Sequence, residues 1–72
     1  MVVSNMYKNL RAEMARQGLT GKQIAAAIEI SPRAFSRRMT GKTEFLFDEA
    51  SQMRRIFFKD CSLNYLFAEL IR

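Results

Sequence analysis

Glycine and proline, which interrupt regular structure, are scarce in this chain, and this scarcity is the strongest constraint on its fold. The 72 residues include three glycines and one proline, whereas a β-sandwich or barrel needs a turn signal every few residues. Gly18 and Gly41 each follow a segment in which apolar residues recur three or four positions apart, as expected where a left-handed residue ends a helix. We therefore expect an all-α fold built from short helices.

Side chains that cap helix N-termini divide the chain further. Thr20 is followed three residues later by Gln23, the spacing of a capping box in which each side chain satisfies the other residue's backbone N–H. Ser31 precedes Pro32, which is favoured at the first position of a helix because the N–H that it lacks would be unpaired there. The five expected helices start after Ser4 or Asn5, after Thr20, after Ser31, near Phe47 and after Ser62.

A chain of this length forms one domain, residues 1–72, whose small core leaves a narrow margin of stability. The single cysteine, Cys61, excludes an internal disulfide, and the absence of histidine removes the usual material for a zinc site. We expect no metal and no cofactor, so that helix packing must supply the stability. The residues expected to face the core are Tyr7, Leu10, Met14, Ile24, Ala25, Ile28, Phe35, Met39, Phe47, Ala50, Met53, Phe57, Leu63, Leu66, Phe67 and Leu70.

Several classes of protein are disfavoured by what the sequence lacks. The start, MVVSN, does not have the basic-then-apolar layout of a signal peptide, and no apolar run approaches membrane-spanning length. We expect a cytoplasmic protein that has no membrane partner and no small-molecule ligand. The run Gly41-Lys42-Thr43 resembles the end of a phosphate-binding loop but lacks the upstream glycine. With no paired carboxylates either, an enzyme is not expected.

The positive charge of the chain is concentrated in one segment. The net charge of +5 suits a polyanionic partner such as a nucleic acid or an acidic surface. The segment ISPRAFSRRMTGK (residues 30–42) holds four cations and no acid. Once Phe35 and Met39 are assigned to the core, Arg33 and Arg37 lie four residues apart on the outward side of the same helix. Guanidinium groups placed in this way can pair bidentately with guanine edges in a major groove.

The stretch LTGKQIAAAIEISPRAFSRRMTGKTEF (residues 19–45) resembles the helix-turn-helix of the Cro/repressor-type (XRE-like) family of phage and bacterial regulators. Ala25 in the second helix, Ile30 after the turn, the cap at Ser31 and the Gly-Lys pair after the third helix carry the resemblance. It implies a compact five-helix, lambda-repressor-like domain whose second and third helices form the helix-turn-helix. It also implies a sequence-specific, repressor-like regulator of transcription whose third helix reads the major groove of double-stranded DNA.

The resemblance assigns DNA contacts to particular residues. Base-reading positions fall on Ser31, Pro32, Arg33, Ser36 and Arg37, and phosphate-binding positions fall on Thr20, Gly21, Lys22, Arg38, Lys42 and Thr43. Pro32 can touch only an apolar base edge such as the thymine methyl group, or it can serve only to start its helix.

Three residues depart from the family's pattern. Glu29 stands where the turn often has a glycine, and a non-glycine residue in a left-handed conformation costs on the order of 1 kcal/mol. Gly21 stands where glutamine is common, so no side chain is available there to brace a phosphate. Leu46 stands where a capping serine or threonine is expected.

The C-terminal region, about residues 57–72, carries more apolar side chains than so short a segment can bury. Phe57 and Phe58 cannot both face inward on an ideal helix, and exposed apolar patches mark interaction surfaces. We therefore expect a homodimer, which would place two third helices about one turn of DNA apart. The expected interface residues are Phe58, Tyr65, Phe67 and Ile71. The alternative is that this region only closes the core of the monomer.

Other functions stay open at this point. The cations of residues 30–42 can form nothing more than a solvated face. The chain can also be a small basic module for protein–protein interaction, such as an antirepressor, with negligible DNA binding at moderate salt. RNA binding is less favoured, because Phe35 is needed in the core and leaves the third helix without an aromatic side chain for stacking.

Overall fold

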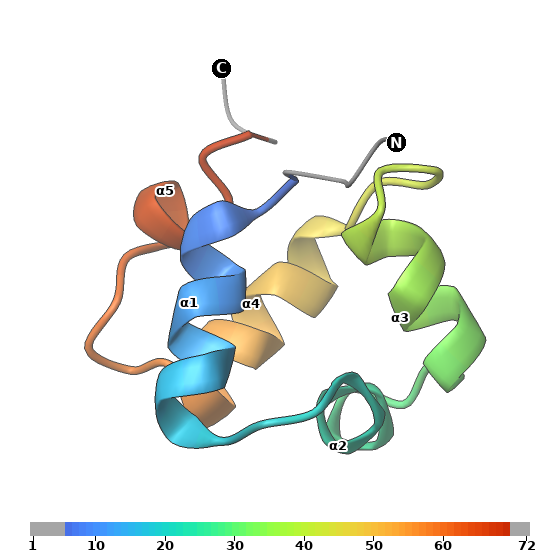
Figure 1. Cartoon of the computed structure of the whole chain (residues 1–72), viewed down its shortest axis with the longest axis horizontal. Coiled ribbons are helices and arrows are strands. Elements are labelled where there is room, and N and C mark those ends of the chain that lie inside the picture. Colours follow the sequence, from blue (N-terminus) through green and yellow to red (C-terminus); the bar gives the residue numbers. More distant parts are fainter. Residues whose placement is uncertain (1–5, 70–72) are drawn as a thin grey trace.

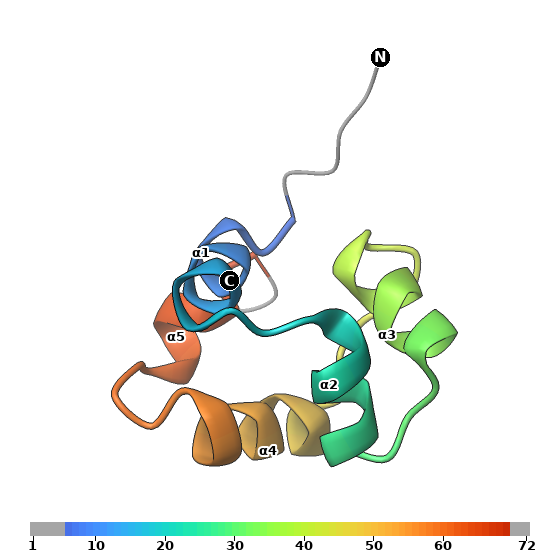
Figure 2. The ribbon, with the colours of Figure 1, turned by 60° about the horizontal axis from the view of Figure 1, so that its bottom comes forward.

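Five short helices carry the fold, and the computed structural model describes residues 6–69 of the chain. They are α1 (Lys8–Gln17), α2 (Gly21–Ala27), α3 (Pro32–Met39), α4 (Phe47–Phe57) and α5 (Leu63–Leu66). Helices α1 and α5 pack together, α2 and α3 form a second pair, and α4 runs across the base of the molecule between them (Figures 1 and 2). The expected all-α, five-helix fold is confirmed. None of the helices within residues 6–69 has the length and apolar character needed to cross a membrane.

The predicted N-terminal caps of three helices are present. The backbone N–H of Gln23 donates to Thr20 Oγ1 at 3.2 Å, and the backbone N–H of Thr20 donates to Gln23 Oε1 at 2.8 Å. Ser31 Oγ accepts from the backbone N–H of Ala34 at 3.0 Å, and Ser62 caps α5 in the same way. Since these bonds satisfy N–H groups that have no partner within their own helix, they fix where α2, α3 and α5 begin.

The two glycines expected to end helices also do so. Gly18 has a φ of 69° and Gly41 a φ of 84°, both left-handed. Beyond Gly18, the backbone N–H of Leu19 returns to the carbonyl of Met14 at 2.8 Å, and beyond Gly41 the same bond closes the end of α3. The half-buried side chain of Leu19 packs against the core. These are the bonds and the apolar contact of a glycine-terminated helix.

The start of α1 differs from the expectation. The helix begins at Lys8, and its N-cap position is Tyr7, which has a φ of 58° and offers no capping side chain. Ser4 and Asn5 lie outside the described residues. Tyr7 is buried as expected, although it lies one residue before α1 and not within the helix. Its ring packs edge-on against Phe45 and Phe67 with centroid distances of 5.3 and 5.8 Å. Burial of this ring offsets the cost of its left-handed backbone.

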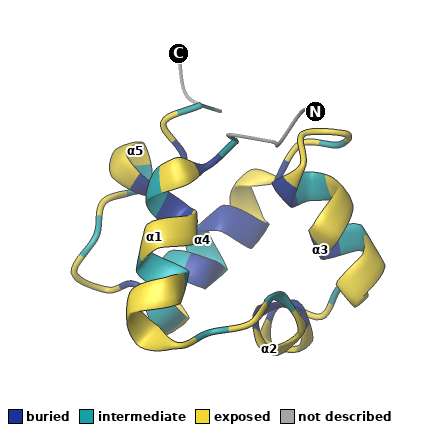
Figure 3. Ribbon diagram, in the orientation of Figure 1, coloured by how far each residue is buried: buried dark blue, intermediate teal, exposed yellow. Residues whose placement is uncertain are grey.

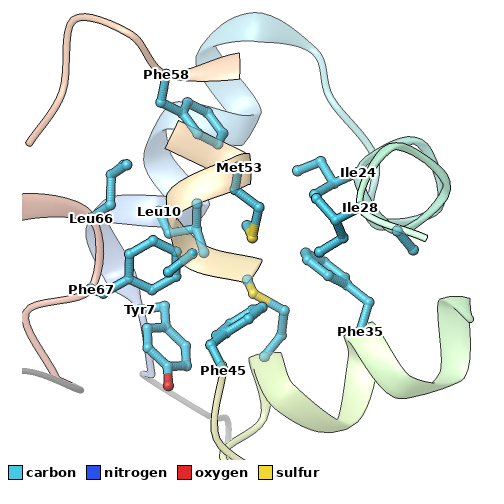
Figure 4. Packing of buried hydrophobic residues seen from close by; sticks show 13 residues of the cluster. Tyr7, Leu10, Ile24, Ile28, Phe35, Phe45, Met53, Phe58, Leu66 and Phe67 are labelled. Atoms are coloured by element: carbon cyan, nitrogen blue, oxygen red, sulfur yellow. The ribbon is translucent and has the colours of Figure 1, made fainter. Parts of the chain in front are cut away.

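An aromatic cluster forms the centre of the core (Figure 4). Phe45 lies in the segment between α3 and α4, and its ring makes edge-on contacts with Tyr7, Phe35 and Phe67 at centroid distances of 5.3 to 5.8 Å. The sequence does not predict this role, because the segment before α4 has no apolar periodicity. Phe45 therefore links α3 to both ends of the described chain.

Helix α4 buries a narrower stripe than its sequence predicts. Ala50 and Met53 are buried, but Phe57 is only half-buried and Phe47 is 73% exposed. The prediction that Phe47 faces the core is wrong, because Phe45 already fills the core at the N-terminal end of α4. Figure 3 shows buried residues along α4 and on the sides of its neighbours that face it.

The C-terminal region closes the core of the monomer. Phe58 and Phe67 are 1% and 0% exposed, so the prediction that they belong to a dimer interface is wrong. Tyr65 is partly exposed, and its hydroxyl donates to Glu13 Oε2 at 3.1 Å. Ile71, the fourth predicted interface residue, lies outside the described part of the chain, as does Leu70. Helix α5 has four residues; it buries Leu66, and Phe67 at its C-cap is buried as well.

Phe45 and Phe47, two residues apart, should differ sharply in their effect on stability. We expect Phe45→Ala to lower the free energy of unfolding by about 3–5 kcal/mol, because it removes a buried ring and leaves a cavity. Phe47→Ala should change it by less than about 0.5 kcal/mol, because that ring is mostly in solvent. Urea unfolding followed by circular dichroism measures both. If Phe45→Ala leaves no folded baseline, Phe45→Leu provides a smaller, measurable loss. Similar losses at positions 45 and 47 would contradict this assignment of the core.

Candidate nucleic-acid interface

The chain turns sharply between α2 and α3. In Figure 1 α2 is seen end-on while α3 is seen from the side, so the two axes cross at a steep angle. Glu29 has a φ of 63°, and the backbone N–H of Ile30 donates to the carbonyl of Ala25 at 3.0 Å. The position at which the sequence lacks the usual glycine is therefore left-handed, and Glu29 bears its cost of about 1 kcal/mol. The half-buried Ile30 packs against the core and helps to hold the turn.

The packing of α2 on α3 explains why residue 21 is a glycine. A Cβ atom on Gly21 would lie 3.0 Å from both Cδ2 and Cε2 of Phe35, tighter than nearly all carbon contacts, so the ring would have to shift by a few tenths of an ångström. The ring of Phe35 is 3% exposed and is held by Phe45, so it has little room to move. The ring of Phe35 thus occupies the space that a larger side chain at Gly21 would need.

The five predicted base-reading residues all lie on the exposed side of α3 or at its start. The hydroxyl of Ser31 is engaged in capping the helix, and Pro32 occupies the first helical position. Arg33 and Arg37 are one turn apart, and no hydrogen bond or ion pair within residues 6–69 involves either guanidinium group. Ser36 lies between them and is exposed. Both arginine side chains are therefore available to an external partner.

The six predicted phosphate-binding residues divide into two groups. Thr20, Lys22 and Lys42 are exposed around the α2–α3 pair, and Gly21 is half-buried and has only a backbone N–H to offer. Arg38 and Thr43, in contrast, are turned inward. The exposed members thus come from the start of α2 and from the segment after α3.

Arg38 belongs to the interior contacts of the protein. Its Nε donates to Glu49 Oε1 at 2.8 Å, and its Nη1 donates to the carbonyl of Ala34 at 3.2 Å. Glu49 is buried, and the same Oε1 accepts the backbone N–H of Leu46 at 3.0 Å. This bond is the Glu half of a capping box, and the other half, a side-chain acceptor on Leu46, is missing. The guanidinium of Arg38 is engaged in compensating a buried carboxylate, which disfavours the predicted phosphate contact at this residue.

Thr43 is also unsuited to the predicted role. Its Oγ1 is enclosed and has no hydrogen-bond partner, and its backbone N–H donates to the carbonyl of Arg37 at 3.4 Å. The prediction of a phosphate contact by this side chain is wrong, because the hydroxyl does not reach the surface.

Arg11 supports α3 in a way that the sequence does not reveal. Its Nη2 donates to the carbonyl of Met39 at 2.9 Å and its Nε to the carbonyl of Met6 at 3.0 Å. The carbonyl of Met39 lies in the last turn of α3, where carbonyl groups lack partners within the helix and attract cations. No local signal separates Arg11 from the solvated cations of α1.

The remaining reactive groups do not form a site of their own. Within residues 6–69, no three His, Cys, Asp or Glu side chains come together in a way that could hold a metal ion. Burial raises the pKa of the Cys61 thiol, and the nearby carboxylates of Glu13 and Asp60 raise it further. At neutral pH this thiol is therefore protonated and is a poor nucleophile.

Comparisons with models of protein families, with curated proteins and with solved structures found no match to this chain.

The close packing of Gly21 on Phe35 can be tested by a double-mutant cycle. We expect Gly21→Ala to lower the free energy of unfolding by about 1–3 kcal/mol, because the added methyl group overlaps the ring. In a Phe35→Leu background the same change should cost at least about 1 kcal/mol less, since Cε2 is gone and the smaller side chain can move aside. Lys22→Ala, the next position of the same helix, serves as the control and should change stability by less than about 0.5 kcal/mol. Additive effects of Gly21→Ala and Phe35→Leu in urea unfolding would rule out the steric explanation.

Proposed function

We propose that this protein is a sequence-specific, double-stranded-DNA-binding regulator of transcription of the Cro/repressor type. In this proposal α2 and α3 act as a helix-turn-helix, and α3 enters the major groove. The observation that carries it is the pair Arg33 and Arg37, whose guanidinium groups are exposed on one side of α3 and have no partner among residues 6–69. Phe35 and Met39 fix the other side of the helix in the core. A helix of about 10–12 Å diameter fits a major groove about 12 Å wide.

Each class of contact has a different role in this proposal. Arg33 and Arg37 present planar forks of donors that match the O6 and N7 acceptors of guanine, and so they supply sequence preference. Lys22 and Thr20 at the start of α2 and Lys42 after α3 are exposed and supply contacts to phosphates, which position the helix without reading sequence. Because phosphate contacts release counterions, affinity should fall steeply as the salt concentration rises.

The proposal includes a homodimer on a near-palindromic operator. Half-sites of such operators lie about 34–36 Å apart, and the longest dimension of the protein is 33 Å. Since the other two dimensions are 25 and 23 Å, two copies can lie side by side at this spacing on one face of the duplex without overlap. The interface excludes Phe58 and Phe67, since both are needed in the core.

The most direct experiment is selection of binding sites from random duplex DNA at two salt concentrations. We expect a recovered consensus with two related half-sites and an affinity that weakens with salt. Recovery of no consensus at either concentration would overturn the proposal. Sedimentation of the protein on the selected duplex gives the stoichiometry, and one copy per complete site would exclude the dimer.

Two single substitutions separate base reading from phosphate binding. Arg37→Ala should cost about 1–3 kcal/mol on the selected duplex and relax sequence preference at one base pair, because it removes a contact to a base. Lys42→Ala should weaken binding to selected and random duplexes alike and reduce the salt slope by about one, because it removes a contact to a phosphate. Gel-shift titrations across a series of salt concentrations measure both effects.

Arg55→Ala is the matched control for these substitutions. Arg55 is exposed on α4 and lies outside the proposed interface, so its removal should leave sequence preference unchanged. Equal losses for Arg37→Ala on selected and random DNA would exclude a base-reading role for Arg37.

A module for protein–protein interaction is the second candidate, favoured by one observation. Leu46 and Phe47 are adjacent and are 60% and 73% exposed, which is unusual for large apolar side chains. This function requires the apolar pair and does not require Arg37. Two results together would favour this candidate over the regulator. The unmodified protein would show negligible DNA binding at moderate salt, and binding to a protein partner would be lost in Phe47→Ser but retained in Arg37→Ala.

A further inference from the structure

The C-terminal half of α3 is attached to the rest of the protein by two guanidinium groups. Helix α3 packs chiefly against α2. Its polar links to other helices, within the part of the chain that the structure describes, are Arg38 Nε to Glu49 Oε1 of α4 and Arg11 Nη2 to the carbonyl of Met39. The position of α3 relative to α1 and α4 therefore depends on two specific contacts as well as on the fit of its apolar side.

The contact between Arg38 and Glu49 is fixed from both sides. The side chains of Arg38 and Glu49 are 18% and 10% exposed, so both are largely shielded from water. Glu49 is oriented by the backbone N–H of Leu46, and Arg38 by the carbonyl of Ala34. Short, charge-assisted hydrogen bonds of this kind are strongly directional. The guanidinium of Arg38 cannot shift without leaving a buried carboxylate unpaired.

A buried ion pair of this kind contributes more to geometry than to net stability. The cost of removing both charges from water offsets much of their attraction, so replacing both partners by neutral side chains is often neutral for stability. What the pair does determine here is the rotation of α3 about its own axis, because Arg38 points at one fixed atom of α4. Arg37 is the adjacent residue on the same helix, so any rotation that released Arg38 would also redirect Arg37.

We infer that Arg38 and Glu49 form a positioning pair, which directs Arg33 and Arg37 into the major groove without touching DNA. This inference rests on the proposed function, since it concerns how the same surface is aimed. A displacement of about 1 Å at a site of recognition or chemistry is enough to cost large factors in rate or affinity. The pair is then a determinant of sequence preference that lies outside the DNA contacts.

The test is the double variant Arg38→Met/Glu49→Gln. It removes one positive and one negative charge, so the net charge of +5 is unchanged and long-range attraction to DNA stays the same. Glutamine retains an oxygen that can accept the backbone N–H of Leu46, so the start of α4 keeps its cap. We expect affinity for the selected duplex to fall about tenfold or more, while affinity for random duplex and the salt slope stay as in the unmodified protein.

Two single variants complete the experiment. Glu49→Gln keeps an acceptor for both Arg38 and Leu46, and we expect it to bind the selected duplex within about twofold of the unmodified protein. Lys42→Ala provides the reference for a lost phosphate contact, with a salt slope reduced by about one. Urea unfolding of each variant at the assay temperature confirms that the folded protein is being compared.

The outcomes distinguish this inference from the proposed function. Unchanged affinity of the double variant for the selected duplex would overturn the positioning role, and so would a salt slope reduced by about one, since that would make Arg38 a phosphate ligand after all. Either result, obtained while Arg37→Ala behaves as expected, leaves the proposed function intact. Failure of the unmodified protein to select any duplex overturns both.

Discussion

The contacts of one aromatic ring hold the parts of this protein together. Phe45 meets Tyr7 from the segment before α1, Phe35 from α3 and Phe67 from the end of α5, each edge-on. A domain of 72 residues buries a modest fraction of its surface, so a ring that contacts three separate elements has a large share in closing the core. The proposed function depends on the position of α3. The contact between the rings of Phe35 and Phe45 helps to hold this helix in place.

The cations around α3 have two different physical roles. Arg33 and Arg37 are exposed and have no partner in the described part of the chain, whereas Arg38 compensates a buried carboxylate. Arg11, from α1, binds the last turn of the same helix. The number of positive charges in residues 30–42 thus overstates the charge that is free to meet a polyanion. The guanidinium groups that hold α3 in place are as relevant to the proposed interface as those that would contact DNA.

The helix boundaries of the middle of the chain were predictable because their signals are local. The capping box of Thr20 and Gln23 and the left-handed Gly18 act over three to five residues, and the structure contains both. Helical periodicity was less reliable for choosing buried residues. It placed Phe47 in the core and gave Phe45 no role, because the extended segment that delivers Phe45 has no period to detect. The exposure of Arg33 and Arg37 followed from Phe35 and Met39, but the inward turn of Arg38 and Thr43 did not.

By itself, the sequence determined that the described chain is helical, where α2 and α3 begin and end, and which side of α3 is apolar. These features depend on hydrogen bonds and side-chain spacing within about one or two turns of helix, where the entropic cost of closing a contact is small. Only the tertiary structure decided which of several phenylalanines fill the one core and which arginines remain free. Those choices depend on competition among residues far apart in sequence, such as Arg38 with Glu49 and Phe45 with Tyr7 and Phe67. Each such contact exists only once the whole chain has folded around it.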